Sequence, residues 1–173
     1  MPLPRRHRPR HTRPALSLEY QSESCGVWLP DPEQPLVLAH FGDAASLAFA
    51  CLEMPVQREA LVLMDEHRAV TAILLDPPPE VGVGVGWCDG PGLEVPFVQT
   101  LDIVIVPEVR MAPPPEADIE GYRSLRRLHM LQGLLLIDVI LVDGNRVQSI
   151  AIGAGLECDW FTDDGTDPLE PAA

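Results

Sequence analysis

Histidine is the side chain in this sequence with the widest chemical use, because its imidazole can bind a metal or titrate near neutral pH. Five histidines are present: His7, His11, His40, His67 and His129. The first two have an i, i+4 spacing that would align them only on a helix, and the prolines around them prevent one. None of the five is paired with a cysteine or an acidic residue at metal-ligand spacing. The histidines therefore predict no metal site.

A glycine-rich segment, residues 81–92, has the composition of a phosphate-binding loop. A dinucleotide-binding loop needs G-x-G-x-x-G between a strand and a helix. Counting from Gly82, the sixth position is Trp87, and counting from Gly84 it is Asp89. Because no G-K-S/T follows either, we interpret the segment as a glycine-rich strand or loop.

The serines and cysteines give no support for nucleophilic catalysis. Ser46 and Ser124 fall in predicted helices without the G-x-S-x-G elbow, and Cys51 lies on an apolar helix face. The four cysteines are scattered and include no C-x-x-C pair: Cys25, Cys51, Cys88 and Cys158. Since the N-terminus has arginines but no apolar signal segment, we interpret them as reduced thiols in a cytoplasmic protein.

Residues 1–14 contain five arginines and no acidic residue, in a proline-rich sequence without hydrophobic periodicity. Such a segment cannot bury enough apolar surface to offset its ordering entropy, which predicts a disordered basic arm. The arginines that could bind a partner are Arg5, Arg6, Arg8, Arg10 and Arg13. They could neutralise nucleic-acid phosphates, but no aromatic residue stands among them for base stacking. We favour a solubilising extension or a misplaced start codon; an arm lying across the acidic body is a further alternative.

Residues 153–173 form an acidic tail that carries two adjacent aromatic residues. Trp160 and Phe161, with aspartates around them, could dock as a short motif in a basic-rimmed groove of a protein partner. The alternative is that both aromatic rings pack on the folded domain. We keep Trp160 and Phe161 as candidate partner-binding residues.

Between these ends, hydrophobic periodicity predicts a folded domain that begins with a short helix. Asp43 is placed to cap this helix, which runs to about Met54. Its buried face is predicted to be Ala44, Leu47, Ala48 and Cys51. A hairpin of two strands follows at residues 60–64 and 69–75. Residues 15–40 are predicted as an extended or irregular lead-in, in which two apolar pieces could pair as a hairpin.

The centre of the domain is predicted to be a strand, a helix and two further strands. Residues 101–106 are an apolar run of strand length, which the proline-rich loop after it ends. A helix is predicted from Glu116 to about Gln132, with acidic residues in its first turn and Gly133 to end it. Residues 134–142 and 146–152 then form two strands around a D-G-N turn. The buried stripe of the helix is predicted to be Ile119, Tyr122, Leu125, Leu128 and Leu131.

Asp138 interrupts the apolar strand LLLIDVILV, where an unpaired buried charge would cost on the order of several kcal/mol. The sequence leaves two alternatives: Asp138 lies on a solvated face, or it pairs with an arginine. The candidate arginines are Arg123, Arg126, Arg127 and Arg146. In either case we predict a structural role for Asp138.

The segment Asp118–Ser149 resembles the C-terminal half of the RadC-like JAB/MPN domain. In that family a D-I-x-x-T-R-R-L helix ends in L-L-G-I, continues as L-L-D-H-L-I-I and turns through G-D-G-R before a last strand. The positions at or near this pattern are Asp118, Ile119, Arg126, Arg127, Leu128, Leu131, Gly133, Asp138, Arg146 and Ser149. The upstream hairpin is similar to the family's L-L-L-D-x-x-N-R-L, with Asp65 and Arg68 in place. The resemblance implies an α/β (α+β) fold, a cytidine-deaminase-like mixed sheet flanked by helices, in one domain over residues 41–152.

JAB enzymes hold zinc with an H-x-H pair after a strand and an aspartate that opens the next helix. Asp118 matches the aspartate, but Pro107 and Val109 stand where the histidines belong. Neither side chain offers a ligand atom, so the resemblance implies no zinc, no other cofactor and no catalytic residue. The family's catalytic glutamate belongs at the far end of the second hairpin strand, near Asp76. The alternative is a hydrolase or peptidase in which Asp118 binds a harder metal, such as magnesium or manganese, together with Glu108 or Glu80.

Charge and hydropathy limit the class of partner. The formal net charge is −14, although the first fourteen residues are basic, so the body should repel nucleic acid and anionic membranes. No apolar run approaches the roughly 20 residues that span a bilayer. Charge and hydropathy thus leave nucleic acid contacted only through the N-terminal arm and no membrane contact. The resemblance implies a non-catalytic module that binds or scaffolds another protein, because JAB/MPN domains without the metal ligands serve as partners in assemblies. None of these patterns encodes the partner's identity or the oligomeric state.

Overall fold

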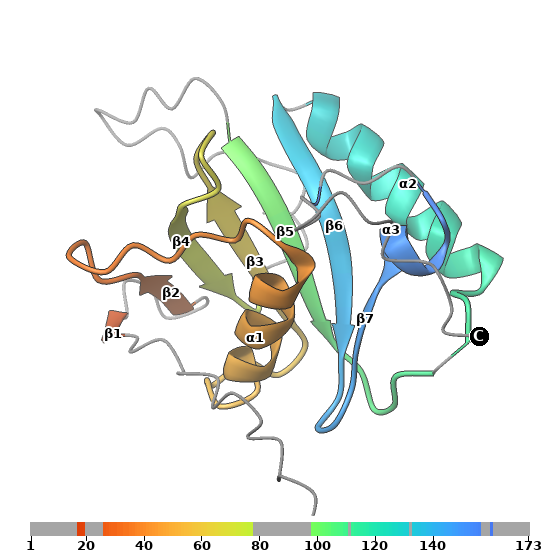
Figure 1. Cartoon of the computed structure of the whole chain (residues 1–173), viewed down its shortest axis with the longest axis horizontal. Coiled ribbons are helices and arrows are strands. Elements are labelled where there is room, and N and C mark those ends of the chain that lie inside the picture. Colours follow the sequence, from red (N-terminus) through yellow and green to blue (C-terminus); the bar gives the residue numbers. More distant parts are fainter. Residues whose placement is uncertain are drawn as a thin grey trace, which may run out of the picture.

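A computed structural model describes residues 17–19, 26–77, 98–110, 112–131, 133–156 and 160. These residues form one mixed sheet of seven strands in the order β1-β2-β4-β3-β5-β6-β7, flanked by helices (Figure 1). The strands are β1 Ser17–Glu19, β2 Gly26–Leu29, β3 Glu59–Met64, β4 Val70–Leu75, β5 Val98–Ile105, β6 Leu134–Val142 and β7 Val147–Ser149. The helices are α1 Phe41–Cys51, α2 Glu116–Leu131 and α3 Ile150–Gly153. The prediction of a mixed sheet flanked by helices in a single domain is confirmed. Of the helices in the described ranges, none combines the length and the hydropathy needed to cross a membrane.

The pair β5 and β6 is parallel, and every other neighbouring pair in the sheet is antiparallel. Parallel neighbours need a crossover connection, and α2 provides it after the proline-rich loop has led the chain out of the sheet. Gly133 ends α2 with a φ of 76°, a left-handed conformation that glycine adopts without strain. The strand-helix-strand unit of the sequence prediction is therefore present.

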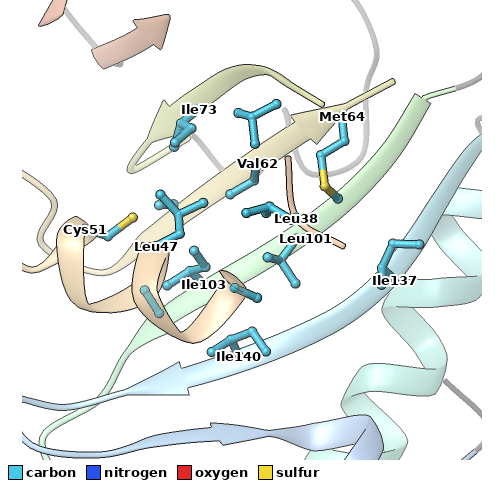
Figure 2. Packing of buried hydrophobic residues seen from close by; sticks show 14 of the residues in the cluster. Leu38, Leu47, Cys51, Val62, Met64, Ile73, Leu101, Ile103, Ile137 and Ile140 are labelled. Carbon is cyan, nitrogen blue, oxygen red and sulfur yellow. The ribbon is translucent and has the colours of Figure 1, made fainter. Parts of the chain in front are cut away.

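Helices α1 and α2 pack on opposite faces of the sheet. Ile137 and Ile140 of β6 belong to the larger core cluster, which includes the buried face of α1 (Figure 2). Leu136 and Val139 belong to a second cluster, which includes Tyr122 of α2. Successive residues of a strand normally point to opposite faces. Ile137 and Val139, two residues apart, nevertheless belong to different clusters, because the register between β5 and β6 shifts at this point. The central strands are consequently covered on both faces.

Helix α1 begins earlier than the sequence indicated. Its N-cap is His40, and Asp43 is the third helical residue. The Asp43 carboxylate reaches back to accept hydrogen bonds from the backbone N–H groups of Ala39, at 3.1 Å, and His40, at 3.0 Å. An acidic residue in this position caps the helix from inside, so the prediction of Asp43 as the N-cap was wrong by three residues. The predicted buried face, Ala44, Leu47, Ala48 and Cys51, is confirmed.

Helix α2 buries part of the predicted stripe, Tyr122 and the partly buried Leu125, and adds His129 to it. Tyr122 and His129 are 4% and 1% exposed, whereas Leu128 is 40% and Leu131 is 85% exposed. The predicted residues are each three positions apart. Because a helical turn takes 3.6 residues, each step of three falls about 60° short of a full turn, so the later positions rotate away from the sheet. His129 turns inward, and its Nδ1 lies 2.9 Å from the buried hydroxyl of Thr100 on β5. His129, which the predicted stripe did not include, is therefore part of the buried face of α2.

The two edges of the sheet also differ from the sequence prediction. At one edge the lead-in adds strands, and at the other edge the last strand is shorter than predicted. The hairpin suggested for two apolar pieces of the lead-in is confirmed: β1 and β2 pair with each other, and β2 extends the sheet beyond β4, so part of the lead-in joins the domain. At the other edge β7 stops at Ser149 instead of continuing to Ile152. The Ser149 hydroxyl accepts the Ile152 N–H at 2.9 Å and thereby begins the short helix α3.

Candidate functional site

The loop after β5 is where the family resemblance implies a pair of zinc-binding histidines. Pro107 is exposed there, and Val109 has no exposed surface. The Val109 backbone is held from both sides: its N–H donates to Asp143 Oδ2 at 2.7 Å, and its carbonyl accepts from Arg146 Nη1 at 3.3 Å. The loop is therefore anchored to the β6–β7 turn with an aliphatic side chain buried beneath it.

Asp143 organises this turn with both of its carboxylate oxygens. Its Oδ1 accepts the backbone N–H groups of Asn145 and Arg146, each at 2.7 Å, while Oδ2 accepts that of Val109. The hydrogen bond from Val109 is the largest of the causes that hold the pKa of Asp143 below its ordinary value, followed by that from Asn145. The resulting stabilisation is present above the ordinary pKa and is lost as the pH falls through the lowered one.

Asp143→Ala is expected to loosen this loop while the sheet stays folded, because the change removes the acceptor of three backbone N–H groups at once. Hydrogen exchange should show reduced protection of the Val109, Asn145 and Arg146 amides and unchanged protection of β3 and β5. Asp143→Asn keeps one carbonyl oxygen and should lose less protection. Equal protection in Asp143→Ala and the unaltered chain would mean that other contacts hold the loop.

Asp118, the one position that matches a metal ligand of the family, lies in the first turn of α2 with an exposed side chain. Its backbone N–H donates to the Pro115 carbonyl at 2.9 Å. Glu108 is also exposed, and Glu80 lies outside the described residues. In the part of the chain that the structure describes, no three His, Cys, Asp or Glu side chains are grouped so that they could hold a metal ion. Asp118 is a surface carboxylate at a helix N-terminus, where the helix dipole favours it.

Asp76, at the end of β4, is engaged by the backbone. Its Oδ2 accepts the N–H of Gln57 at 2.7 Å, and its Oδ1 accepts those of Arg58 at 2.7 Å and Glu59 at 3.2 Å. Asp76 has a φ of 46°, in the left-handed region that aspartate enters more readily than most residues. The Asp76 carboxylate thus links the end of β4 to the start of β3, and its role is structural.

Asp138 is a carboxylate without exposed surface on β6. Its Oδ1 accepts the backbone N–H groups of Val139, at 2.8 Å, and Ala151, at 3.1 Å. Its Oδ2 accepts the Ser149 hydroxyl and the Trp160 Nε1–H, the latter at 2.8 Å. Burial raises the pKa of Asp138, and the four hydrogen bonds act against that rise. Both alternatives drawn from the sequence, a solvated face and an arginine partner, were wrong, because these described partners are uncharged donors.

Trp160 is 8% exposed and packs in the larger core cluster. The guanidinium of Arg68 lies over its ring, 5.5 Å from the centroid, in a cation–π contact. Trp160 therefore packs on the folded domain, and its prediction as a partner-binding residue was wrong. Phe161 lies outside the described residues, as do the arginines of the arm: Arg5, Arg6, Arg8, Arg10 and Arg13.

Asp102 and Glu59 form a pair of carboxylates on the neighbouring strands β5 and β3. Asp102 lies opposite Leu61 and Glu59 opposite Val104, so the two acids are diagonal neighbours on one face. Asp102 is 6% exposed, and its Oδ1 has no hydrogen-bond partner in the described structure. Burial raises the pKa of Asp102 to about 8, and the charge of Glu59 adds to this effect. The pKa of Glu59 is raised as well, chiefly by burial, with Arg58 acting in the opposite direction.

The sequence contains a signal for Asp102 that our interpretation passed over. An acidic residue inside an apolar run of strand length drew attention to Asp138, and LDIVIV contains Asp102 in the same kind of context. With its raised pKa, the Asp102 carboxyl group is mostly protonated at neutral pH. A neutral carboxyl group costs much less to bury than a carboxylate, which explains how the strand tolerates it.

The last turns of α2 carry large apolar side chains that reach solvent. We call Leu128, Met130 and Leu131 the α2 patch; they are 40%, 63% and 85% exposed. Isolated exposed apolar residues are common on proteins and need no explanation. Leu128 and Leu131, three residues apart, are neighbours on the helix surface, whereas Met130, two residues from Leu128, lies on another side of the helix. This patch lies at the end of α2 that leads into β6, away from the Val109 loop (Figure 1).

Comparison with known proteins adds no relative to this description. The chain matches no protein-family model, no curated protein and no solved structure.

Proposed function

We propose that this chain is a non-catalytic JAB/MPN-like domain that binds or scaffolds another protein. The observation that carries the proposal is the state of the loop after β5. Val109 is buried where a metal-binding histidine would be required, and Asp143 and Arg146 hold its backbone in place. A zinc site needs three or four ligands converging at about 2.0–2.3 Å, and valine supplies none.

The order of elements supports the family part of the proposal. A short helix, α1, directly precedes the hairpin β3–β4, and the strand β5, a loop, α2 and the strands β6 and β7 follow. In the β3–β4 turn, Asp65 Oδ1 accepts the N–H groups of His67, at 2.8 Å, and Ala69, at 2.9 Å. Arg68 adopts a left-handed φ of 63° in the same turn. These contacts give a physical reason for the aspartate that this turn shares with the family pattern.

The binding part of the proposal is supported by the α2 patch. A soluble domain with no partner gains nothing from leaving Met130 and Leu131 in water, since burying such side chains is worth about 1.5–3 kcal/mol each. Exposed apolar clusters of this kind mark protein interaction sites. The other exposed large apolar side chains among the described residues do not extend the patch, because Val37 lies in the segment before α1 and Phe49 lies on α1.

Metal analysis of the purified protein tests the non-catalytic part. We expect bound zinc, magnesium or manganese well below one ion per chain, and no change in Asp118→Ala. Glu116→Ala serves as the matched control, because Glu116 is an exposed acid in the same helical turn that matches no ligand position. Stoichiometric metal that disappears in Asp118→Ala and persists in Glu116→Ala would overturn the proposal and favour a metal-dependent hydrolase.

A further inference from the structure

The α2 patch contains a basic group as well as apolar ones. Arg127 is exposed and lies three residues before Met130 and four before Leu131, so it is a neighbour of both on the helix surface. Leu128 and Leu131 are three residues apart and lie side by side in the same way. The exposed end of α2 is therefore a strip in which Leu128, Leu131, Arg127 and Met130 follow one another around the helix, with the guanidinium between Leu131 and Met130.

Arg127 differs from the other arginines of α2 in what it contacts. Arg123 binds two acids of its own helix, Glu120 at 2.7 Å and Glu116 at 3.4 Å. Arg126 donates to the Tyr122 hydroxyl at 3.1 Å. Within the described ranges Arg127 has no ion-pair partner, although the chain as a whole is strongly acidic.

The sequence that carries the patch is basic, in contrast to the chain as a whole. Between Glu120 and Asp138 the sequence has three arginines and no acidic residue, although Arg123 is balanced by Glu116 and Glu120. Charges separated by more than about 8–10 Å are largely screened at physiological salt, so the positive charge offered to a small ligand on this strip is chiefly that of Arg127. The strip is therefore locally complementary to a negatively charged ligand.

We propose that the α2 patch binds an acidic amphipathic segment of a partner protein, with apolar side chains of the segment on Leu128 and Leu131 and a carboxylate of the segment paired with Arg127. This inference rests on the proposed protein-binding function and names its surface and its partner chemistry. The recognition resembles the docking of a helix in a groove, where apolar anchors supply affinity and a flanking charge fixes orientation.

Two other occupants fit the strip less well. A second copy of the chain would meet it through a two-fold axis, which brings the same surface of each copy together and sets the two Arg127 side chains near each other. An anionic membrane is an extended plane and would face much of the acidic body, whose net charge is −14, in addition to the strip. A short acidic segment avoids both repulsions.

Binding of a designed peptide to the full-length chain tests the proposal. The probe is a helix-forming peptide of about 15 residues, with leucines spaced to make one apolar face and glutamates beside it. The comparison peptide has lysine in place of every glutamate. By fluorescence anisotropy the acidic peptide should bind at tens to hundreds of micromolar, and the lysine peptide at least about tenfold more weakly. Raising the salt from about 50 to about 500 mM should weaken only the acidic peptide's binding.

Substitutions in the strip locate the binding surface. Leu131→Ser and Arg127→Glu should each weaken binding of the acidic peptide about tenfold, and Arg127→Glu should improve binding of the lysine peptide. The matched controls are Val37→Ser, which changes an exposed apolar residue in the segment before α1, and Arg110→Glu, which changes an exposed arginine in the loop after β5. Neither control should change the affinity, and circular dichroism checks that all four variants keep the fold.

Several results would overturn this assignment. They are an absence of binding by the acidic peptide, equal binding of both peptides, or binding that is unchanged in Leu131→Ser and Arg127→Glu. Light scattering that shows a dimer dissociated by Leu131→Ser would instead assign the strip to a second copy, and co-sedimentation with phosphatidylserine vesicles would assign it to a membrane. Each of these outcomes is independent of the metal analysis, so the proposed function can stand or fail separately.

Discussion

Asp102→Asn should make the protein markedly more stable at pH 8 than the unaltered chain, with little difference between the two at pH 4. The pKa of Asp102 is raised to about 8 in the folded protein, first by burial and then by the charge of Glu59. The unfolded chain ionises this group near its ordinary value of about 3.9. Between these two values the folded state holds a proton that the unfolded state has lost.

The sign of the effect follows from this difference in bound protons. Stability falls with rising pH wherever the folded state binds more protons, here by at most about 1.4 kcal/mol per pH unit. The contribution of Asp102 is therefore fully present below about pH 4 and is lost as the pH rises toward 8, a total on the order of a few kcal/mol. Asparagine has no proton to lose, so Asp102→Asn should remove this part of the pH dependence.

Urea unfolding at several pH values measures the effect. The quantity of interest is the difference in free energy of unfolding between Asp102→Asn and the unaltered chain, because the other titrating groups cancel in it. Glu33→Gln, which alters an exposed acid on a turn, is the matched control and should give a flat difference. A difference for Asp102→Asn that is equally flat from pH 4 to pH 8 would contradict the prediction.

Asp138→Ala is expected to destabilise the protein by about 3–5 kcal/mol, a large part of the 5–15 kcal/mol that holds a typical domain folded. The change removes the acceptor of two backbone N–H groups, the Ser149 hydroxyl and the Trp160 indole N–H. Water cannot replace it easily, because Asp138 has no exposed surface and Ser149 and Trp160 are 4% and 8% exposed. Buried donors without an acceptor cost about 1–3 kcal/mol each.

Asp138→Ala is expected to lower the free energy of unfolding even though the ionised carboxylate itself does not stabilise the folded protein. Burial raises the pKa of Asp138 despite four hydrogen bonds, so the environment costs the ionised form more than the donors return. The destabilisation in Asp138→Ala comes from the stranded donors and from the cavity, not from the lost charge. Substitution of Asp138, which accepts four hydrogen bonds, should thus destabilise the protein, whereas substitution of Asp102, whose Oδ1 has no described partner, should stabilise it at pH 8.

A double-mutant cycle with Trp160→Phe tests this account of Asp138. Trp160→Phe removes one of the four donors and keeps an aromatic ring beneath Arg68. With the donor already absent, Asp138→Ala should cost about 1 kcal/mol or more less than it does in the unaltered chain. Additive costs, or a single-mutant cost below about 1 kcal/mol, would show that the indole N–H does not depend on Asp138.

Local sequence patterns determined much of the fold. The buried face of α1, the turn between β3 and β4, and the strand-helix-strand unit around α2 all followed from hydrophobic spacing, prolines and helix-ending glycine. Such patterns are reliable because they reflect contacts between residues close in the chain, where geometry is set by backbone periodicity. The same local patterns identified Pro107 and Val109 as side chains without metal-ligand atoms.

Only the tertiary structure decided how distant side chains meet. Trp160 reaches Asp138 from beyond α3, Asp102 comes beside Glu59 across two strands, and Asp143 holds the Val109 loop. The rotation of α2 that buries His129 and exposes Leu131 is fixed by contacts with the sheet, such as those of His129 with Thr100 on β5 and of Tyr122 with Ile137 on β6. These pairings depend on strand register and helix packing, which no short stretch of sequence encodes because each is fixed by residues far away in the chain.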